Sequence, residues 1–86
     1  MCYNNGMENR IAVVAAIVGN ESAVEKVNER LHEYREYIVG RFGLPLRDKG
    51  VSVINVVIDA AQEVISGLSG KLGMIDGVVC KVLTAK

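Results

Sequence analysis

The sequence predicts an α+β fold of the ferredoxin-like βαββαβ type, a sandwich in which a four-stranded antiparallel sheet carries two helices on one face. Apolar runs and helical periodicity alternate along the chain in the order strand, helix, strand, strand, helix, strand. The two central strand segments are also apolar at successive positions, which is typical of strands buried on both faces. Because two helices cover only one face of such a sheet, we expect a second body to cover the other face.

The first strand and the first helix follow from an apolar run and a helical stripe. The expected strands are 9–19, 37–43, 51–58 and 77–84, and the expected helices are 22–36 and 60–72. The run from Ile11 to Val18 contains no polar residue, which predicts a central strand. Ser22 and Glu25 match a capping box at the start of the first helix. The apolar stripe of that helix consists of Val24, Val27, Leu31 and Tyr34.

The middle of the chain predicts an edge strand and then a second central strand. Gly40 and Gly43 weaken the first of these, which suits an edge position. Pro45 is expected to end it, because proline lacks the backbone donor for further pairing. The segment 51–58 alternates between two sets of residues. One face is expected to hold Ile54, Val56 and Ile58, and the other Val51, Val53, Asn55 and Val57.

The second helix and the last strand complete the fold. Asp59 is expected to cap this helix, with Gln62 three residues later. Gly73 suits the left-handed position after the last helical turn, and Asp76 and Gly77 form a turn before the final strand. The apolar stripe of the helix consists of Ala61, Val64, Ile65, Leu68 and Leu72.

The chain is short and electrically neutral, which bounds its organisation and its partners. Residues 1–8 are expected to be a flexible leader, and residues 9–86 a single domain. Ten basic and ten acidic side chains give a formal charge of zero, so we expect no direct binding to nucleic acid, whose phosphates attract basic proteins. The first residues lack the basic region and apolar stretch of a signal peptide, and the longest apolar run is too short to cross a bilayer. A cytoplasmic protein without membrane contact is expected.

The sequence holds few residues for catalysis or metal binding. His32 is its one histidine and is expected on the polar side of the first helix. Cys2 and Cys80 are far apart and belong to no paired motif. Cys80 is expected to be a small apolar core residue, with a reactive thiol as the alternative. One imidazole and two separated thiols do not build a four-ligand site or a catalytic set, so we expect no enzyme, no bound metal and no cofactor.

Two kinds of candidate site remain. Val53, Asn55 and Val57 are candidates for a subunit interface, because a buried amide among apolar residues needs a hydrogen-bond partner. The alternative for Asn55 is exposure to solvent on an uncovered face. The candidate ligand-binding residues lie in the first strand–helix turn, before a helix N-terminus, and in a basic segment further on. They are Gly19, Asn20, Glu21, Ser22, Arg41 and Arg47; the alternative is an ordinary turn and ordinary solvated charges.

Four segments make the chain similar to a known family. They are RIAVVAAIV from Arg10, VNERLHEY leading into IVGRFGLP, GVSVINVVID from Gly50, and LSGKLGMIDGVVCK ending at Lys81. On these segments the chain resembles the iron-only hydrogenase system regulators, which are stand-alone ferredoxin-like domains of ACT-like shape, related to the ligand-binding domain of the nickel-responsive repressor. The resemblance implies a regulatory or sensory role connected to hydrogenase maturation. It does not extend to the repressor's nickel site or DNA-binding domain, whose residues this chain lacks.

We therefore expect a small regulatory module that forms a homo-oligomer, either a dimer or a tetramer. It would sense a small-molecule effector or dock on a protein partner in the iron-only hydrogenase system, with changes at a subunit interface carrying the signal. The alternative is a structural interaction protein that assembles maturation components and binds no small molecule.

Overall fold

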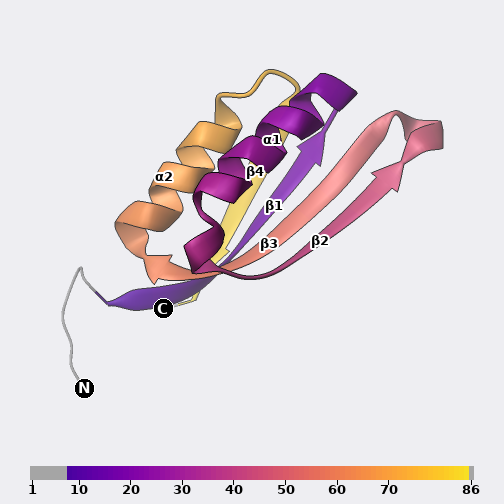
Figure 1. Cartoon of the computed structure of the whole chain (residues 1–86). Helices are drawn as coiled ribbons and strands as arrows, with labels where there is room; N and C mark the ends of the chain where they lie inside the picture. Colours follow the sequence, from indigo (N-terminus) through magenta and orange to yellow (C-terminus); the bar gives the residue numbers. More distant parts are fainter. Residues whose placement is uncertain (1–7, 86) are drawn as a thin grey trace.

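The computed structural model describes residues 8–85, which form one antiparallel sheet and two helices (Figure 1). The strands are β1 (Asn9–Val18), β2 (Ile38–Leu46), β3 (Val51–Ala61) and β4 (Val78–Thr84), and the helices are α1 (Glu21–Glu33) and α2 (Gln62–Gly73). The strand order β2-β3-β1-β4 is that of a ferredoxin-like fold, so the predicted fold class is confirmed. Residues 1–7 of the expected leader lie outside the described residues.

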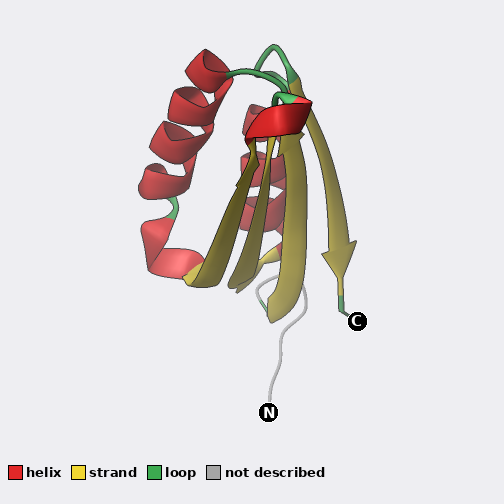
Figure 2. Ribbon diagram, turned by 90° about the vertical axis from the view of Figure 1, so that its right-hand side faces the viewer, coloured by secondary structure: helices red, strands yellow, loops and turns green. Residues whose placement is uncertain are grey.

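The core lies between the sheet and the helices, which occupy the same side of it (Figure 2). β1 and β3 pair from Asn9 with Ala61 to Val18 with Ser52, so alternate residues of both strands face the helices, as predicted. The buried side chains of the two strands are Ala12, Val14, Ala16, Val18, Ile54, Val56, Ile58 and Ala60. The helices add Ala23, Val27 and Leu31 from α1, and Ile65, Leu68 and Leu72 from α2.

Asn20 caps α1. Its Oδ1 accepts a hydrogen bond from the backbone amide of Ala23 at 2.8 Å. Ser22 lies inside the helix, and its Oγ donates to the same Oδ1 atom at 2.9 Å. The predicted capping box at Ser22 is therefore wrong. Asparagine is at least as strong an N-cap as serine. Because Asn20 precedes Ser22 in the chain, the helix begins directly after Asn20.

Strand β3 runs to Ala61, beyond the predicted end at residue 58. Pairing with β1 continues along this extension and holds Asp59 in the ladder opposite Ile11. α2 therefore begins at Gln62, and the residue in its N-cap position, Ala61, makes no side-chain hydrogen bond. The prediction that Asp59 caps α2 is wrong, because strand pairing takes precedence over its capping preference.

Strand β2 occupies an edge of the sheet, as predicted. It begins at Ile38, after α1 has ended at Glu33 and a 3-10 turn has spanned Arg35–Tyr37. Pro45 does not end it, contrary to the prediction, and pairs with Ser52 of β3. An edge strand needs ladder donors on one side only, so it tolerates a proline.

Two glycines have positive φ angles within residues 8–85. Gly50 (φ 71°) closes the turn between β2 and β3, and Gly77 (φ 90°) leads into β4. A Cβ on Gly77 would lie 2.7 Å from Nδ2 of the capping Asn20. Gly73, predicted to be left-handed, is instead the last residue of α2, so that prediction is wrong.

We expect Gly77→Ala to destabilise the fold more than Gly50→Ala. Either substitution puts a side chain at positive φ, which costs on the order of 1–2 kcal/mol. Gly50 has open space around it, whereas the new methyl group at Gly77 would also displace the α1 cap. Urea titrations of both variants would measure the two losses, and equal losses would show that contact with Asn20 imposes no constraint.

Candidate functional site

The face of the sheet opposite the helices is open and mainly apolar. Leu83 is 73% exposed there and Phe42 55%. Other large exposed side chains on this face include Ile11, Ile17, Leu44 and Val79. Smaller or half-buried residues between them complete the surface, including Val13, Ala15, Val53 and Val57. We call this surface the open face.

Asn55 lies near the middle of the open face, with Ala15 beside it on β1 and Phe42 on β2. Its side chain is partly exposed and forms no hydrogen bond with the rest of residues 8–85. The predicted interface residues Val53 and Val57 lie on either side of it on the same face. An unpaired amide is tolerated while water reaches it and needs a partner once the face is covered.

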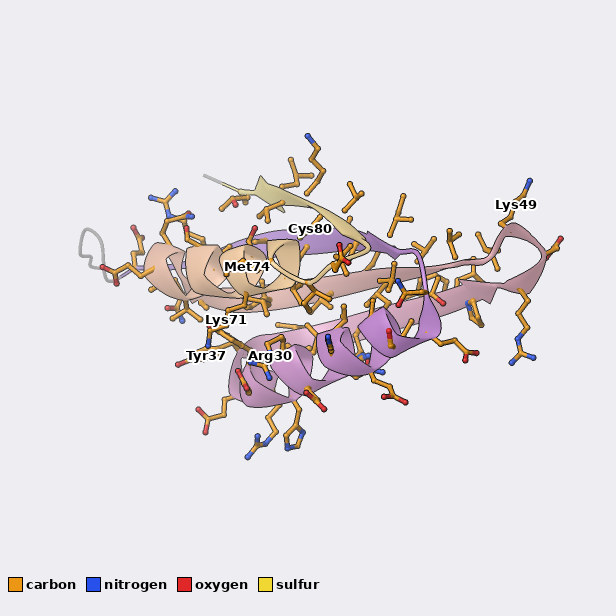
Figure 3. The ribbon with its side chains drawn as sticks, turned by 90° about the horizontal axis from the view of Figure 1, so that it is seen from above. Arg30, Tyr37, Lys49, Lys71, Met74 and Cys80 are labelled. Carbon is orange, nitrogen blue, oxygen red and sulfur yellow. The ribbon has the colours of Figure 1, made fainter. Side chains whose placement is uncertain are left out.

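A second candidate region is the groove between the start of α1 and the β2–β3 hairpin. The hairpin projects past the N-terminal end of α1, with Lys49 at its tip (Figures 1 and 3). The groove has a volume of about 410 Å³. It is lined by Asn20, Glu21, Val24, Pro45, Arg47, Gly50, Val51 and Ser52. An adjoining pocket of about 250 Å³ shares Val24, Pro45 and Ser52 with it and includes Arg41.

Four of the six predicted ligand-binding residues therefore lie around two adjoining cavities. Asn20, Glu21 and Arg47 line the groove, and Arg41 lines the adjoining pocket. Gly19 and Ser22 line neither cavity. Sequence spacing alone could not show this convergence, which depends on how closely α1 packs against the hairpin.

Several polar groups at this end of the molecule already have partners. The Gly19 amide donates to the Gly77 carbonyl at 2.8 Å. The Asn20 side chain accepts a hydrogen bond from the Ala23 amide. Arg41 Nη2 donates to Asn28 Oδ1 at 2.7 Å. In contrast, Arg47 forms no ion pair or side-chain hydrogen bond within residues 8–85. Arg47 is therefore the cation in the groove that is available to an anionic group.

A third cavity, of about 370 Å³, lies between α1 and α2 and was not anticipated from the sequence. The Glu33 carboxylate joins Arg30 at 3.2 Å and Lys71 at 3.5 Å, and the Lys71 ammonium lies 5.2 Å from the centre of the Tyr34 ring. Figure 3 shows Arg30, Lys71 and Met74 near one another on this side. These exposed ion pairs contribute little stability. The Glu33–Lys71 pair connects two helices whose relative placement the sequence does not reveal.

The described residues hold little that suits metal binding. No group of three or more His, Cys, Asp or Glu side chains within residues 8–85 could hold a metal ion. His32 is exposed, as predicted.

Cys80 is partly buried against the core, and burial raises the pKa of its thiol despite an opposing hydrogen bond from Ser69. No helix of the described part of the chain has both the length and the apolar character needed to cross a membrane.

These features define a ferredoxin-like α+β domain whose sheet is open on one face. The chain matches the TM1266-like family, described as "Iron-only hydrogenase system regulator, putative", over residues 10–82. It belongs to this family, and the resemblance inferred from its sequence segments is confirmed. No curated protein sequence matches the chain.

Solved structures agree with this assignment. Uncharacterized protein TM1266 from Thermotoga maritima is 38% identical and covers 92% of this chain and 100% of its own, with a TM-score of 0.88. The C-terminal domain of MgtC from Mycobacterium tuberculosis is 13% identical, covers 98% and 94%, and has a TM-score of 0.71. A formyltetrahydrofolate deformylase from Pseudomonas putida KT2440 is 20% identical, covers 88% and 29%, and has a TM-score of 0.63. The last two show a shared fold only.

Cys80 is expected to react slowly with iodoacetamide in the folded protein. Because burial raises the pKa of its thiol, the thiolate that reacts is scarcer at pH 8 than in an exposed cysteine. A Cys2→Ser background makes Cys80 the single reporter, and mass spectrometry follows alkylation with and without urea. Ser69→Ala should slow the folded reaction further, since it removes a hydrogen bond that lowers the pKa. Equal rates in folded and unfolded protein would contradict this reading.

Proposed function

We propose that this regulator-family member is a non-enzymatic cytoplasmic module that works as a homo-oligomer joined through its open face. The single observation that carries the proposal is the row of large apolar side chains that no helix covers, with Leu83 73% exposed at one border. Contiguous apolar surface of this kind on a small protein marks an interaction site. The lack of a candidate metal cluster within residues 8–85 agrees with a role in association.

The size of the open face matches what a stable interface requires. Four strands about 4.8 Å apart, each rising about 3.3 Å per residue, give a face of roughly 20 by 30 Å. A standard interface buries about 800 Å² of accessible surface on each partner, and the accessible area of a corrugated face exceeds its flat projection. Covering this face with one copy of the chain therefore supplies the area that stable association needs.

Light scattering on the purified protein should give a mass that is a multiple of the 9.3 kDa chain mass at micromolar concentration. Ile17→Lys should yield the monomer, because it places a charge among the apolar residues of the open face. Met74→Lys is the matched control, since Met74 is 86% exposed and lines the cavity between α1 and α2, away from the open face. The oligomer of this variant should persist. A stable wild-type mass near 9.3 kDa would exclude the proposal.

A second function, sensing of a small anionic effector, is supported by the convergence of Asn20 and Arg47 on one groove. The same hairpin carries Arg47 in the groove and Leu44 on the open face. A ligand that fixed the hairpin would therefore alter association, provided that it binds the two assembly states with different affinity. This is a direct physical route from a small molecule to a regulatory output.

Thermal-shift assays with inorganic phosphate, citrate and AMP would test the effector site. A ligand at one hundred times its Kd stabilises the native state by about 2.7 kcal/mol. We expect Arg47→Ala to abolish the shift and Arg41→Ala to reduce it. Ser22→Ala should leave it unchanged, because Ser22 does not line the cavities. Normal binding by both arginine variants would place the site elsewhere.

The alternative of a structural interaction protein makes different predictions. It requires association to be insensitive to all three anions and requires capture of hydrogenase-maturation proteins from cells that contain the system. A thermal shift that disappears in Arg47→Ala would argue against this alternative. Capture that survives Ile17→Lys would place the partner away from the open face.

A further inference from the structure

The open face carries two charged side chains of opposite sign. Strand alternation and register direct Asp59 of β3 and Lys81 of β4 to this face. Every other residue that the four strands direct there is uncharged. Neither Asp59 nor Lys81 forms an ion pair within residues 8–85. The face is therefore neutral overall and holds both halves of an ion pair.

The two charges are too far apart to pair within one chain. Asp59 lies beside Ile11 and Lys81 beside Ala15, on opposite sides of β1. Four residues along a strand span about 13 Å, and two strand spacings add about 10 Å across. The point midway between the two charges lies over Val13, which is halfway from Ile11 to Ala15 along β1.

We propose that a second copy of the chain covers the open face about a two-fold axis over Val13, so that Lys81 of each copy pairs with the partner's Asp59. This inference rests on the proposed function, which requires that copies associate through this face. A two-fold interface is self-complementary, so one anion and one cation on a single face form two equivalent pairs. A strongly acidic or basic partner would find no matching net charge here.

The same axis fixes other features of the dimer. The two-fold axis that exchanges Asp59 with Lys81 runs obliquely to the strands. The two sheets therefore cross at a steep angle, as in orthogonal sheet packing. Val13 then lies against the partner's Val13, and the large apolar residues around it are removed from water. The two ion pairs lie on either side of this apolar centre and set the orientation of the copies, as charges at interfaces commonly do.

Charge-reversal variants test the pairing directly. Lys81→Glu or Asp59→Lys alone brings like charges together and should weaken dimerisation at least tenfold, as measured by sedimentation equilibrium. The double variant, with both charges exchanged, should return the Kd to within about threefold of the wild type. Asp48→Lys and Lys49→Glu, at the exposed hairpin tip, are matched controls that should leave the Kd unchanged. Circular dichroism verifies that each variant is folded.

Each outcome bears on a separate part of the inference. Single reversals with wild-type Kd values, or a double variant that is not restored, would overturn the pairing. If the pairing failed but Ile17→Lys were monomeric, the proposed association through the open face would stand without the ion pairs. A monomeric wild type would overturn both. Raising the salt concentration should weaken the wild-type dimer and have little effect on a Lys81→Met, Asp59→Asn variant; equal salt dependence would contradict the pairing even if a reversal variant failed to fold.

Discussion

The structure depends on one geometric constraint: two helices cover one face of a four-stranded sheet and no more. On β1 the helix-facing positions include the small residues Ala12 and Ala16, which let the helices pack close to the strands. The opposite positions of the same strand include the larger Ile11 and Ile17, which are about half exposed. A monomer would be expected to bury the larger side chains and expose the smaller ones. The reversed distribution on β1 supports a partner that buries the open face.

The same constraint connects the two candidate sites. The β2–β3 hairpin supplies Arg47 to the groove beside α1 and Leu44 to the open face. A movement of the hairpin at the groove would therefore also move Leu44 on the open face. No series of side-chain contacts through the core is needed for this coupling. The ferredoxin-like fold occurs in proteins as different as MgtC and a deformylase, so the fold alone does not specify function. The residues of the open face and of the groove beside α1 are what distinguish this chain from those proteins.

The sequence predicted the order of the elements and the residues that share a face, because periodicity reports both directly. The separation of Ile54 and Val56 from Val53 and Asn55 is an example. The predictions that failed lie at element ends, where local preference competes with pairing. Strand pairing holds Asp59 in β3 despite its preference for helix caps. At the candidate sites, the sequence indicated Arg41 and Arg47 but not the cavities that they line, since the cavities depend on the distance between α1 and the hairpin.

The length of β3 also decides which surface the molecule presents. Had β3 ended at residue 58, Asp59 would have turned towards the start of α2, and Lys81 would have been the one charge on the open face. Because the ladder continues to Ala61, the carboxylate remains on the sheet surface, on the opposite side of β1 from the ammonium. The extension changes a face with net positive charge into a neutral one that can complement a second copy of itself. A local outcome of strand pairing thereby sets the net charge of the open face.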